Sequence, residues 1–183
     1  MIISRVAGRY ANALFTEAQQ TKALETIVGD LRGLRAMLEE SRDFALFVAN
    51  PAIKAANKQA ALAALAEKAA FSATIKNWLA LLVEKSRISE LADIIAAFET
   101  LYNKAHNIMP VLVTSAFELD SSQKSQLIVK LEAQTGKKIQ PTYATNPSLI
   151  GGFTVQIGDT LIDSSISRQL ATLKKRMMES ALN

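Results

Sequence analysis

A change of hydrophobic period near residues 104–110 constrains the fold of this chain more than any other feature. Before it, apolar residues recur at the three- and four-residue spacing of amphipathic helices. After it, Met109-Pro110 interrupts the helical pattern, and the β-branched run 111–117 has the two-residue period of a strand. We therefore expect a domain boundary that separates residues 1–106 from residues 107–183.

Residues 1–106 contain six helical segments joined by short connections, a pattern that predicts a helix bundle. The expected helices are 4–19, 24–40, a short one around 44–48, 54–70, one capped by Ser72 and one that follows Arg87-Ile88-Ser89. Thr21 stands where it can cap the second helix. Asn50-Pro51 must end the third, because the residue before a proline is pushed out of the α region.

Residues 107–183 mix both periods. Asp120 with Gln123 resembles a capping box, and Thr135-Gly136 closes the helix that it opens. Ile139 to Thr145 is extended, and Pro141 within it indicates an edge strand. A last helix carries Ile166, Leu170, Leu173 and Met177. The expected order is β-α-β-β-β-α, so the whole chain is mainly α, with a six-helix bundle followed by a small α+β domain.

The third and fourth strands are expected to form a tight β-hairpin. Phe153, Val155 and Ile157 alternate with polar residues, and Gly158-Asp159 fills a two-residue turn. Pairing Ile157 with Thr160 places Val155 opposite Ile162, so one face of the hairpin is apolar.

Composition excludes several classes of protein. The chain has no Cys, which removes disulfides, thiolate zinc sites and Cys nucleophiles. Its apolar runs fall far short of the roughly 18 residues that a membrane span needs. The N-terminus lacks the features of a secretory signal, so cytosolic exposure is the default.

Asp163, Ser165 and Ser167 form the motif D-x-S-x-S, whose oxygen atoms could share a hard cation such as Mg²⁺. The competing interpretation, which we favour, is structural: Asp163 ends a strand, and Ser164 or Ser165 caps the final helix. We therefore expect no metal and no cofactor.

The glycines and the histidine also favour structural roles. Gly151-Gly152 and Gly158 precede or follow a strand instead of opening a helix, which favours turn and bulge geometry over a phosphate cradle. His106 has no Ser, Asp or Glu at motif spacing and fits a linker better than a catalytic base.

Two kinds of surface could bind a partner. Lys137-Lys138 and Lys174-Lys175-Arg176 could touch nucleic acid, although the net charge is only +4 and no aromatic residues interleave with them. Apolar side chains surround most of the helix that carries Trp78. That helix is either the centre of the bundle or one wall of a groove for a partner helix.

Four stretches in the same order resemble one family. They are Arg9–Phe15, Leu46–Pro51 with Ile53, Asn77–Leu82 continuing to Arg87-Ile88, and Gly151–Ile166. Together these stretches are similar to the δ subunits of F-type ATP synthases, which are related to the mitochondrial oligomycin-sensitivity-conferral protein. The last stretch is the most specific, because Gly-Gly, the Gly-Asp turn and Asp-x-Ser occur together at fixed spacing. Trp78 stands where the family often has Phe, and Lys85-Ser86 replaces its usual turn.

The resemblance implies a non-catalytic stator subunit of the peripheral stalk, located at the cytoplasmic face of the cell membrane without insertion. It implies that the bundle receives the N-terminal segments of α subunits and that the second domain binds the C-terminal ends of b subunits. On this basis the residues expected to line the α-binding groove are Tyr10, Ala13, Leu14, Trp78, Leu81 and Leu82. Those expected to build the hairpin and the cap are Gly151, Gly152, Gly158, Asp159, Asp163 and Ser165. The alternative is a basic two-domain protein that binds nucleic acid.

Overall fold

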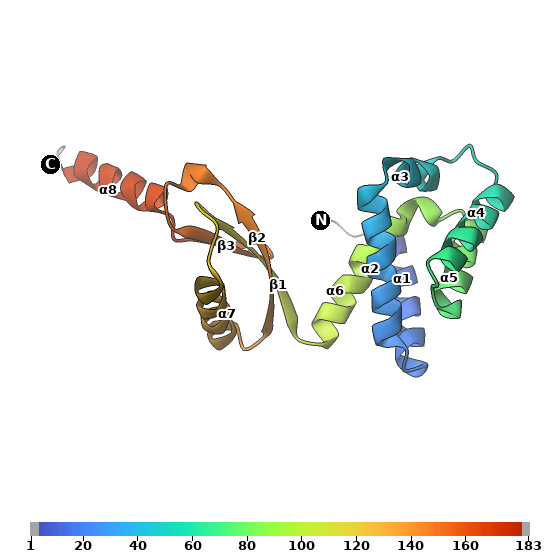
Figure 1. The fold of residues 1–183 in the computed structure, drawn as a ribbon. Helices are drawn as coiled ribbons and strands as arrows, with labels where there is room; N and C mark the ends of the chain where they lie inside the picture. The colour runs from blue at the N-terminus through green and yellow to red at the C-terminus, as the bar shows by residue number, and fades with distance from the viewer. Residues whose placement is uncertain (1–3, 181–183) are drawn as a thin grey trace. The chain divides into compact units, whose positions relative to one another are not determined.

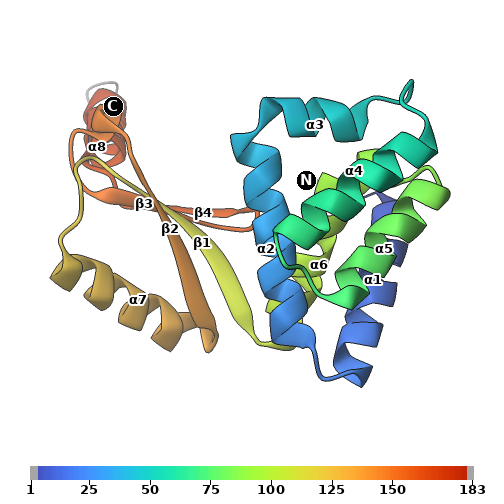
Figure 2. The same ribbon diagram turned by 45° about the vertical axis from the view of Figure 1, so that its right-hand side comes forward.

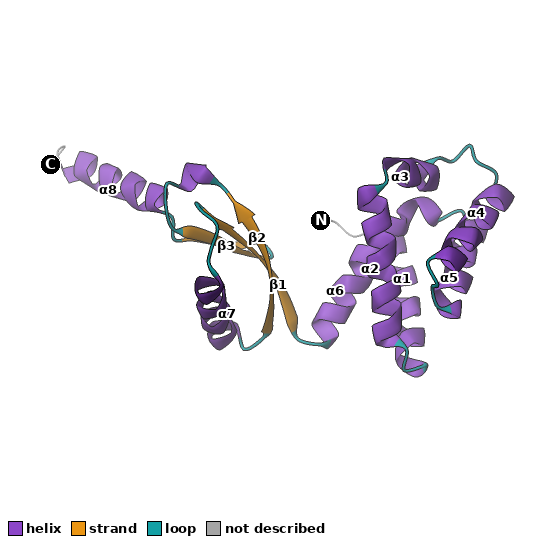
Figure 3. Ribbon diagram, viewed as in Figure 1, coloured by secondary structure: helices purple, strands orange, loops and turns teal. Residues whose placement is uncertain are grey.

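The computed structural model describes residues 4–180, apart from the side chains of residues 175, 176 and 178–180. The chain forms two compact units that divide between Tyr102 and Asn103, close to the boundary expected after His106. The first unit is helical, and the second combines helices with a four-stranded sheet (Figures 1 and 3). The expected fold class, mainly α with a small α+β part, is confirmed.

The helices of the first unit follow the periodic segments of the sequence. They are α1 (Arg5–Gln20), α2 (Leu24–Glu40), α3 (Arg42–Ala49), α4 (Ala55–Lys68), α5 (Ala73–Glu84) and α6 (Leu91–Ala105), with a short 3₁₀ turn, η1 (Ile88–Glu90), before α6. Ser72 caps α5 as expected, because its Oγ accepts a hydrogen bond from the N–H of Ile75 at 3.4 Å. Thr21 does not cap α2: its Oγ1 donates to the carbonyl of Glu17 at 2.8 Å and thereby ends α1.

The core of the first unit draws apolar side chains from all of these helices. Its largest fully buried members are Phe98, Leu14, Ile27, Leu31, Leu34, Ile75, Leu79, Leu82, Leu91, Ile94 and Ile95. Phe15 and Phe98 add an edge-to-face ring contact, with centroids 5.6 Å apart and planes inclined at 68°. Figure 2 shows α4 and α5 side by side, and the small side chains of α4 permit this close approach.

The second unit is built in the expected order. Its elements are β1 (Ile108–Ser115), α7 (Ser121–Thr135), β2 (Lys138–Thr145), a 3₁₀ turn η2 (Pro147–Leu149), β3 (Phe153–Ile157), β4 (Thr160–Asp163) and α8 (Ile166–Ser180). The strand order is β2-β1-β3-β4, with β1 and β2 parallel and the other pairs antiparallel. Parallel neighbours need a crossover, which α7 supplies. Leu131 of α7 joins Val111, Val113, Ile139 and Val155 of the sheet in a second core.

Local signals fixed both ends of α7 and the hairpin. Asp120 and Gln123 form the expected capping box, and Gly136 closes α7 in the left-handed conformation with φ of +66°. In the hairpin Ile157 pairs with Thr160 and Val155 with Ile162, so the expected register is confirmed. The apolar face is only partly buried, however: Val155 is 1% exposed and Ile162 is 41% exposed.

Both prolines within strands lie where the sheet tolerates a missing N–H. Pro141 belongs to β2, which is an edge strand as expected. The expected start of β1 at Val111 was wrong, because the strand already begins at Ile108 and runs through Pro110. Since β3 pairs only with residues from Val111 onwards, Pro110 stands where β1 has one neighbour and one free edge.

Candidate partner-binding surfaces

The residues expected to line a groove between α1 and α5 occupy two different layers. Leu14 and Leu82 are 1% and 0% exposed and belong to the bundle core, together with Trp78 at 7%. Tyr10 is half-buried against that core. Only Ala13 and Leu81 are exposed, and these two side chains mark the outer surface of α1 and α5. Figures 1 and 2 both draw these helices beside each other.

Trp78 carries a polar group that the fold leaves unsatisfied. Its indole Nε1–H is buried and has no hydrogen-bond acceptor among the described residues. Burying such a donor without an acceptor costs about 1–3 kcal/mol. The neighbouring exposed position on the same helix, Leu81, is 41% exposed. One helix of the bundle therefore combines an unpaired donor with an uncovered apolar side chain.

A larger uncovered apolar surface lies on α8. Ile166, Leu170, Leu173 and Met177 are 42%, 53%, 55% and 66% exposed. Their spacing of four, three and four residues places them on one face of the helix, and we call this set the α8 stripe. Figure 1 shows α8, in red, running outwards from the sheet. The sequence pattern correctly predicted the helix but did not indicate that its apolar face stays uncovered.

The D-x-S-x-S motif joins β4 to α8. Asp163 Oδ1 accepts a hydrogen bond from the N–H of Ser165 at 2.9 Å, and Ser165 Oγ accepts one from the N–H of Arg168 at 3.3 Å. Ser165 is fully buried, with its Oγ 3.2 Å from that of Ser167. The side chain of Ser165, then its N–H, and then the Arg168 guanidinium 3.8 Å away hold the pKa of Asp163 below its ordinary value. These hydrogen bonds have the geometry of a strand end followed by a helix cap.

The glycines of the same region are required by close packing and by turn geometry. Gly152 has φ of +78°, and a Cβ atom there would lie 2.4 Å from the carbonyl oxygen of Ser164. A Cβ atom on Gly151 would lie 2.5 Å from Cδ1 of Ile166. Gly158 has φ of +56° in the hairpin turn, and Asp159 beside it is exposed. The geometry thus fits the predicted turn at Gly158, while Gly152 permits a close approach of two backbone segments.

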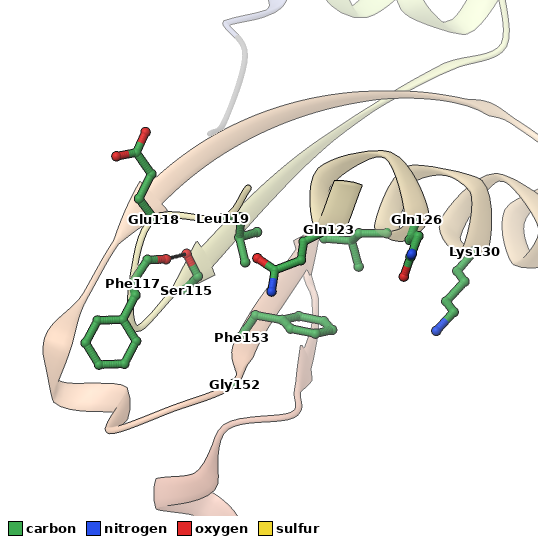
Figure 4. A pocket seen from close by; sticks show the side chains of 10 residues that line it. Ser115, Phe117, Glu118, Leu119, Gln123, Gln126, Lys130, Gly152 and Phe153 are labelled. Carbon is green, nitrogen blue, oxygen red and sulfur yellow. Dashed lines mark hydrogen bonds between the residues drawn. The ribbon is translucent and has the colours of Figure 1, made fainter. Parts of the chain in front are cut away.

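A cavity of about 400 Å³ opens between the end of β1, the first turns of α7 and the start of β3. Its wall includes Phe117, Gln123, Lys130 and Phe153, and Phe117 is 71% exposed (Figure 4). Ser115 Oγ donates to the Phe117 carbonyl at 2.6 Å and fixes the turn after β1. The sequence pattern places Phe117 inside the strand-like run 111–117, whereas β1 ends at Ser115, so the pattern did not indicate this cavity.

The basic residues considered for nucleic-acid binding are exposed where the structure describes them. Lys137, Lys138 and Lys174 are exposed, and the side chains of Lys175 and Arg176 lie outside the described residues. His106 occupies the exposed turn between α6 and β1. No cluster of three or more His, Cys, Asp or Glu residues suited to a metal ion occurs among the described residues. Within the same range, no helix is long and apolar enough to cross a membrane.

Comparison with known proteins covers both units. The family model described as "ATP synthase delta (OSCP) subunit" matches residues 6–177. ATP synthase subunit delta of Desulforamulus reducens is 38% identical over 178 residues, which make up 97% of this chain and 98% of the relative. The Rhodospirillum rubrum protein of the same name is 36% identical over 175 residues, covering 96% of this chain and 94% of that one.

Comparison with solved structures also finds an ATP synthase chain. A chain of the Toxoplasma gondii mitochondrial ATP synthase hexamer matches with a TM-score of 0.77 and 27% sequence identity. The match covers 96% of this chain and 98% of that chain. These relatives give the nucleic-acid alternative no support. With a family model matched across nearly its whole length, the chain belongs to the ATP synthase delta (OSCP) subunit family.

Proposed function

We propose that this chain links the catalytic head of an F-type ATP synthase to its peripheral stalk and resists the torque of the rotor. The chain is a non-catalytic subunit of that enzyme, as its family membership implies. One observation carries the division of labour proposed here: each unit has uncovered apolar side chains, Ala13 of α1 and Leu81 of α5 in the first and the α8 stripe in the second. A linker needs two such contact areas and no reacting groups.

The first unit, residues 1–106 in the sequence-based division, is proposed to receive the N-terminal segments of α subunits. An amphipathic helix laid along α1 and α5 would cover Ala13 and Leu81 and rest against Tyr10. Trp78 and the buried pair Leu14 and Leu82 form the layer beneath that surface. A polar group of the incoming segment could satisfy the unpaired Nε1–H of Trp78.

The second unit, residues 107–183, is proposed to bind the C-terminal ends of the b subunits through the α8 stripe. Its alternating spacing of four and three residues suits packing against another helix. The exposed Lys174 lies within the same stretch of α8, so a partner helix with acidic flanks would complement this surface. Through these partners the chain would lie at the cytoplasmic face of the cell membrane without entering it.

Binding to purified catalytic heads tests the proposed function. The full chain is mixed with intact heads and with heads whose α N-terminal segments have been removed. Binding should be retained by the intact heads and lost with the trimmed heads. Equal binding to both preparations would contradict the assignment of the α segments as partners.

Substitutions at two exposed leucines test where on the first unit the α segment binds. Leu81→Asp should weaken binding to intact heads at least about tenfold, because it places a charge in the apolar surface. Leu46→Asp is the matched control, since Leu46 is 56% exposed on α3, away from the proposed surface. Leu14 and Leu82 are unsuitable positions for this binding test, because aspartate at a fully buried position would disrupt the bundle. Equal loss in both exposed variants would overturn the location.

A further inference from the structure

The first unit has a recess whose lining includes no residue of α1. It occupies about 510 Å³ between the α3–α4 connection, the start of α4, the end of α5 and η1. Ile53, Val83 and Ile88 supply apolar walls, and Lys54, Lys58 and two serines supply polar groups. Its volume lies within the range of small-ligand pockets, and its walls combine apolar and polar groups in similar measure.

Lys58 is the unusual member of this wall. Its side chain is buried, with the residue only 6% exposed, although lysine is almost never buried without a charged partner. The Nζ atom donates one hydrogen bond, to the carbonyl oxygen of Val48 at 2.8 Å. No carboxylate of the described residues forms an ion pair with it. An ammonium group has three donors, so a neutral carbonyl satisfies only part of this one.

The charge at this position is compensated only by the carbonyl end of α3, since Val48 lies in the last turn of that helix. Burial lowers the pKa of Lys58 below its ordinary value, because desolvation disfavours the charged form. The start of α4 adds positive potential, because the N–H groups of its first turn donate no hydrogen bond to the side chain of the N-cap residue, Lys54. The lining residues include no Asp or Glu. An anion entering the recess would meet a buried cation, and no carboxylate lines the wall.

We propose that this recess binds a short aliphatic monocarboxylate, with its carboxylate at the Lys58 ammonium and its tail along Ile53, Val83 and Ile88. A single buried cation matches a single negative charge, and the apolar walls favour an aliphatic tail over a second charged group. This site is separate from the surfaces proposed for the α and b subunits, so the chain would also be a small-molecule binder.

Hexanoate is the probe, titrated into the full chain carrying ¹³C-labelled lysine side chains. The Lys58 εCH₂ signal should shift with a saturating dependence on hexanoate, and its pKa should rise on binding, because the carboxylate stabilises the ammonium. Hexanol has the same tail without a charge, and inorganic phosphate has charge without a tail. Each should bind at least about tenfold more weakly.

Two variants complete the test. Lys58→Met keeps an unbranched side chain without the charge and should abolish the hexanoate-dependent rise in melting temperature. Lys68→Met alters an exposed lysine at the other end of α4 and should leave that rise intact. A Lys58 signal that does not respond to hexanoate would overturn the proposal. So would hexanol or phosphate binding as tightly as hexanoate. If Lys58→Met fails to fold, the wild-type titration still decides.

Discussion

At the scale of single residues, Gly152 and Gly158 illustrate two different physical reasons why a position requires glycine. Both have positive φ, which costs a residue with a Cβ atom about 1–2 kcal/mol. Only Gly152 also faces backbone: an added Cβ would lie 2.4 Å from the Ser164 carbonyl oxygen, whereas Gly158 has open space. The first is needed where η2 and β3 meet the start of α8, and the second only in the turn.

Gly152→Ala should therefore destabilise the second unit more than Gly158→Ala. We expect a loss of about 1 kcal/mol for Gly158→Ala from its backbone conformation alone. For Gly152→Ala we expect about 3 kcal/mol or more, because backbone must move as well. Hydrogen exchange of the Val155 amide, in the core of the sheet, measures both. Fluorescence of the single tryptophan cannot report the stability of the second unit, since Trp78 lies in the first unit. Equal losses would mean that the region around Ser164 yields to the added atom.

Asp163 makes the cap of α8 sensitive to acid. Ser165 and Arg168 hold its pKa below the ordinary value of 3.8. The stabilisation is therefore fully present above pH 3.8 and disappears as the pH falls through the lower pKa of the folded state. We expect Asp163→Asn to lower the stability of the second unit at neutral pH and to make no difference in strong acid. A difference that persists in strong acid would contradict this origin.

At the scale of whole elements, the sequence predicted best what depends on neighbouring residues. The capping box of Asp120 and Gln123 and the pairing of Ile157 with Thr160 follow from local chemistry, and both were predicted. Thr21 had the right residue type for a cap, but its hydroxyl bonds the preceding helix. The run of β1 through Pro110 depends on where β3 ends, which no local pattern reveals.

The sites were less predictable than the elements, because burial is a tertiary property. Leu14 and Leu81 look equally apolar in the sequence, yet one is 1% exposed and the other 41%. Lys58 sits in an alanine-rich helix whose pattern gives no reason to bury a lysine. The α8 stripe has the spacing of a core-facing helix, and only the structure shows that nothing in the described chain covers it.

That uncovered helix leads to a prediction about the stalk. Leu173→Asp should weaken binding to the C-terminal segment of a b subunit at least about tenfold, because it puts a charge in the middle of the α8 stripe. The folded chain should lose less than about 0.5 kcal/mol, since Leu173 is 55% exposed. Val129→Asp is the control, with Val129 64% exposed on α7. Isothermal titration measures both, and unchanged affinity of Leu173→Asp would exclude the stripe.

At the scale of the whole molecule, the chain has two cores that share no residue and one proposed partner surface on each unit. A stator works only when both ends are attached, because torque that is not held at one end turns the head with the rotor. The two surfaces should therefore matter equally for the coupled reaction, although they bind different partners. Neither surface should matter for the chemistry of ATP, which takes place in other subunits.

Membrane vesicles carrying the complete ATP synthase test this equivalence. Leu81→Asp and Leu173→Asp should each reduce proton-driven ATP synthesis at least about tenfold, because a tenfold loss of affinity at either end leaves few intact stators at limiting subunit concentration. ATP hydrolysis by the catalytic heads should remain, since their active sites are unaltered. Leu46→Asp and Val129→Asp should leave both activities unchanged, because these residues are exposed outside the two surfaces. If one surface variant uncoupled the enzyme and the other did not, the unaffected unit would hold its partner through a different surface.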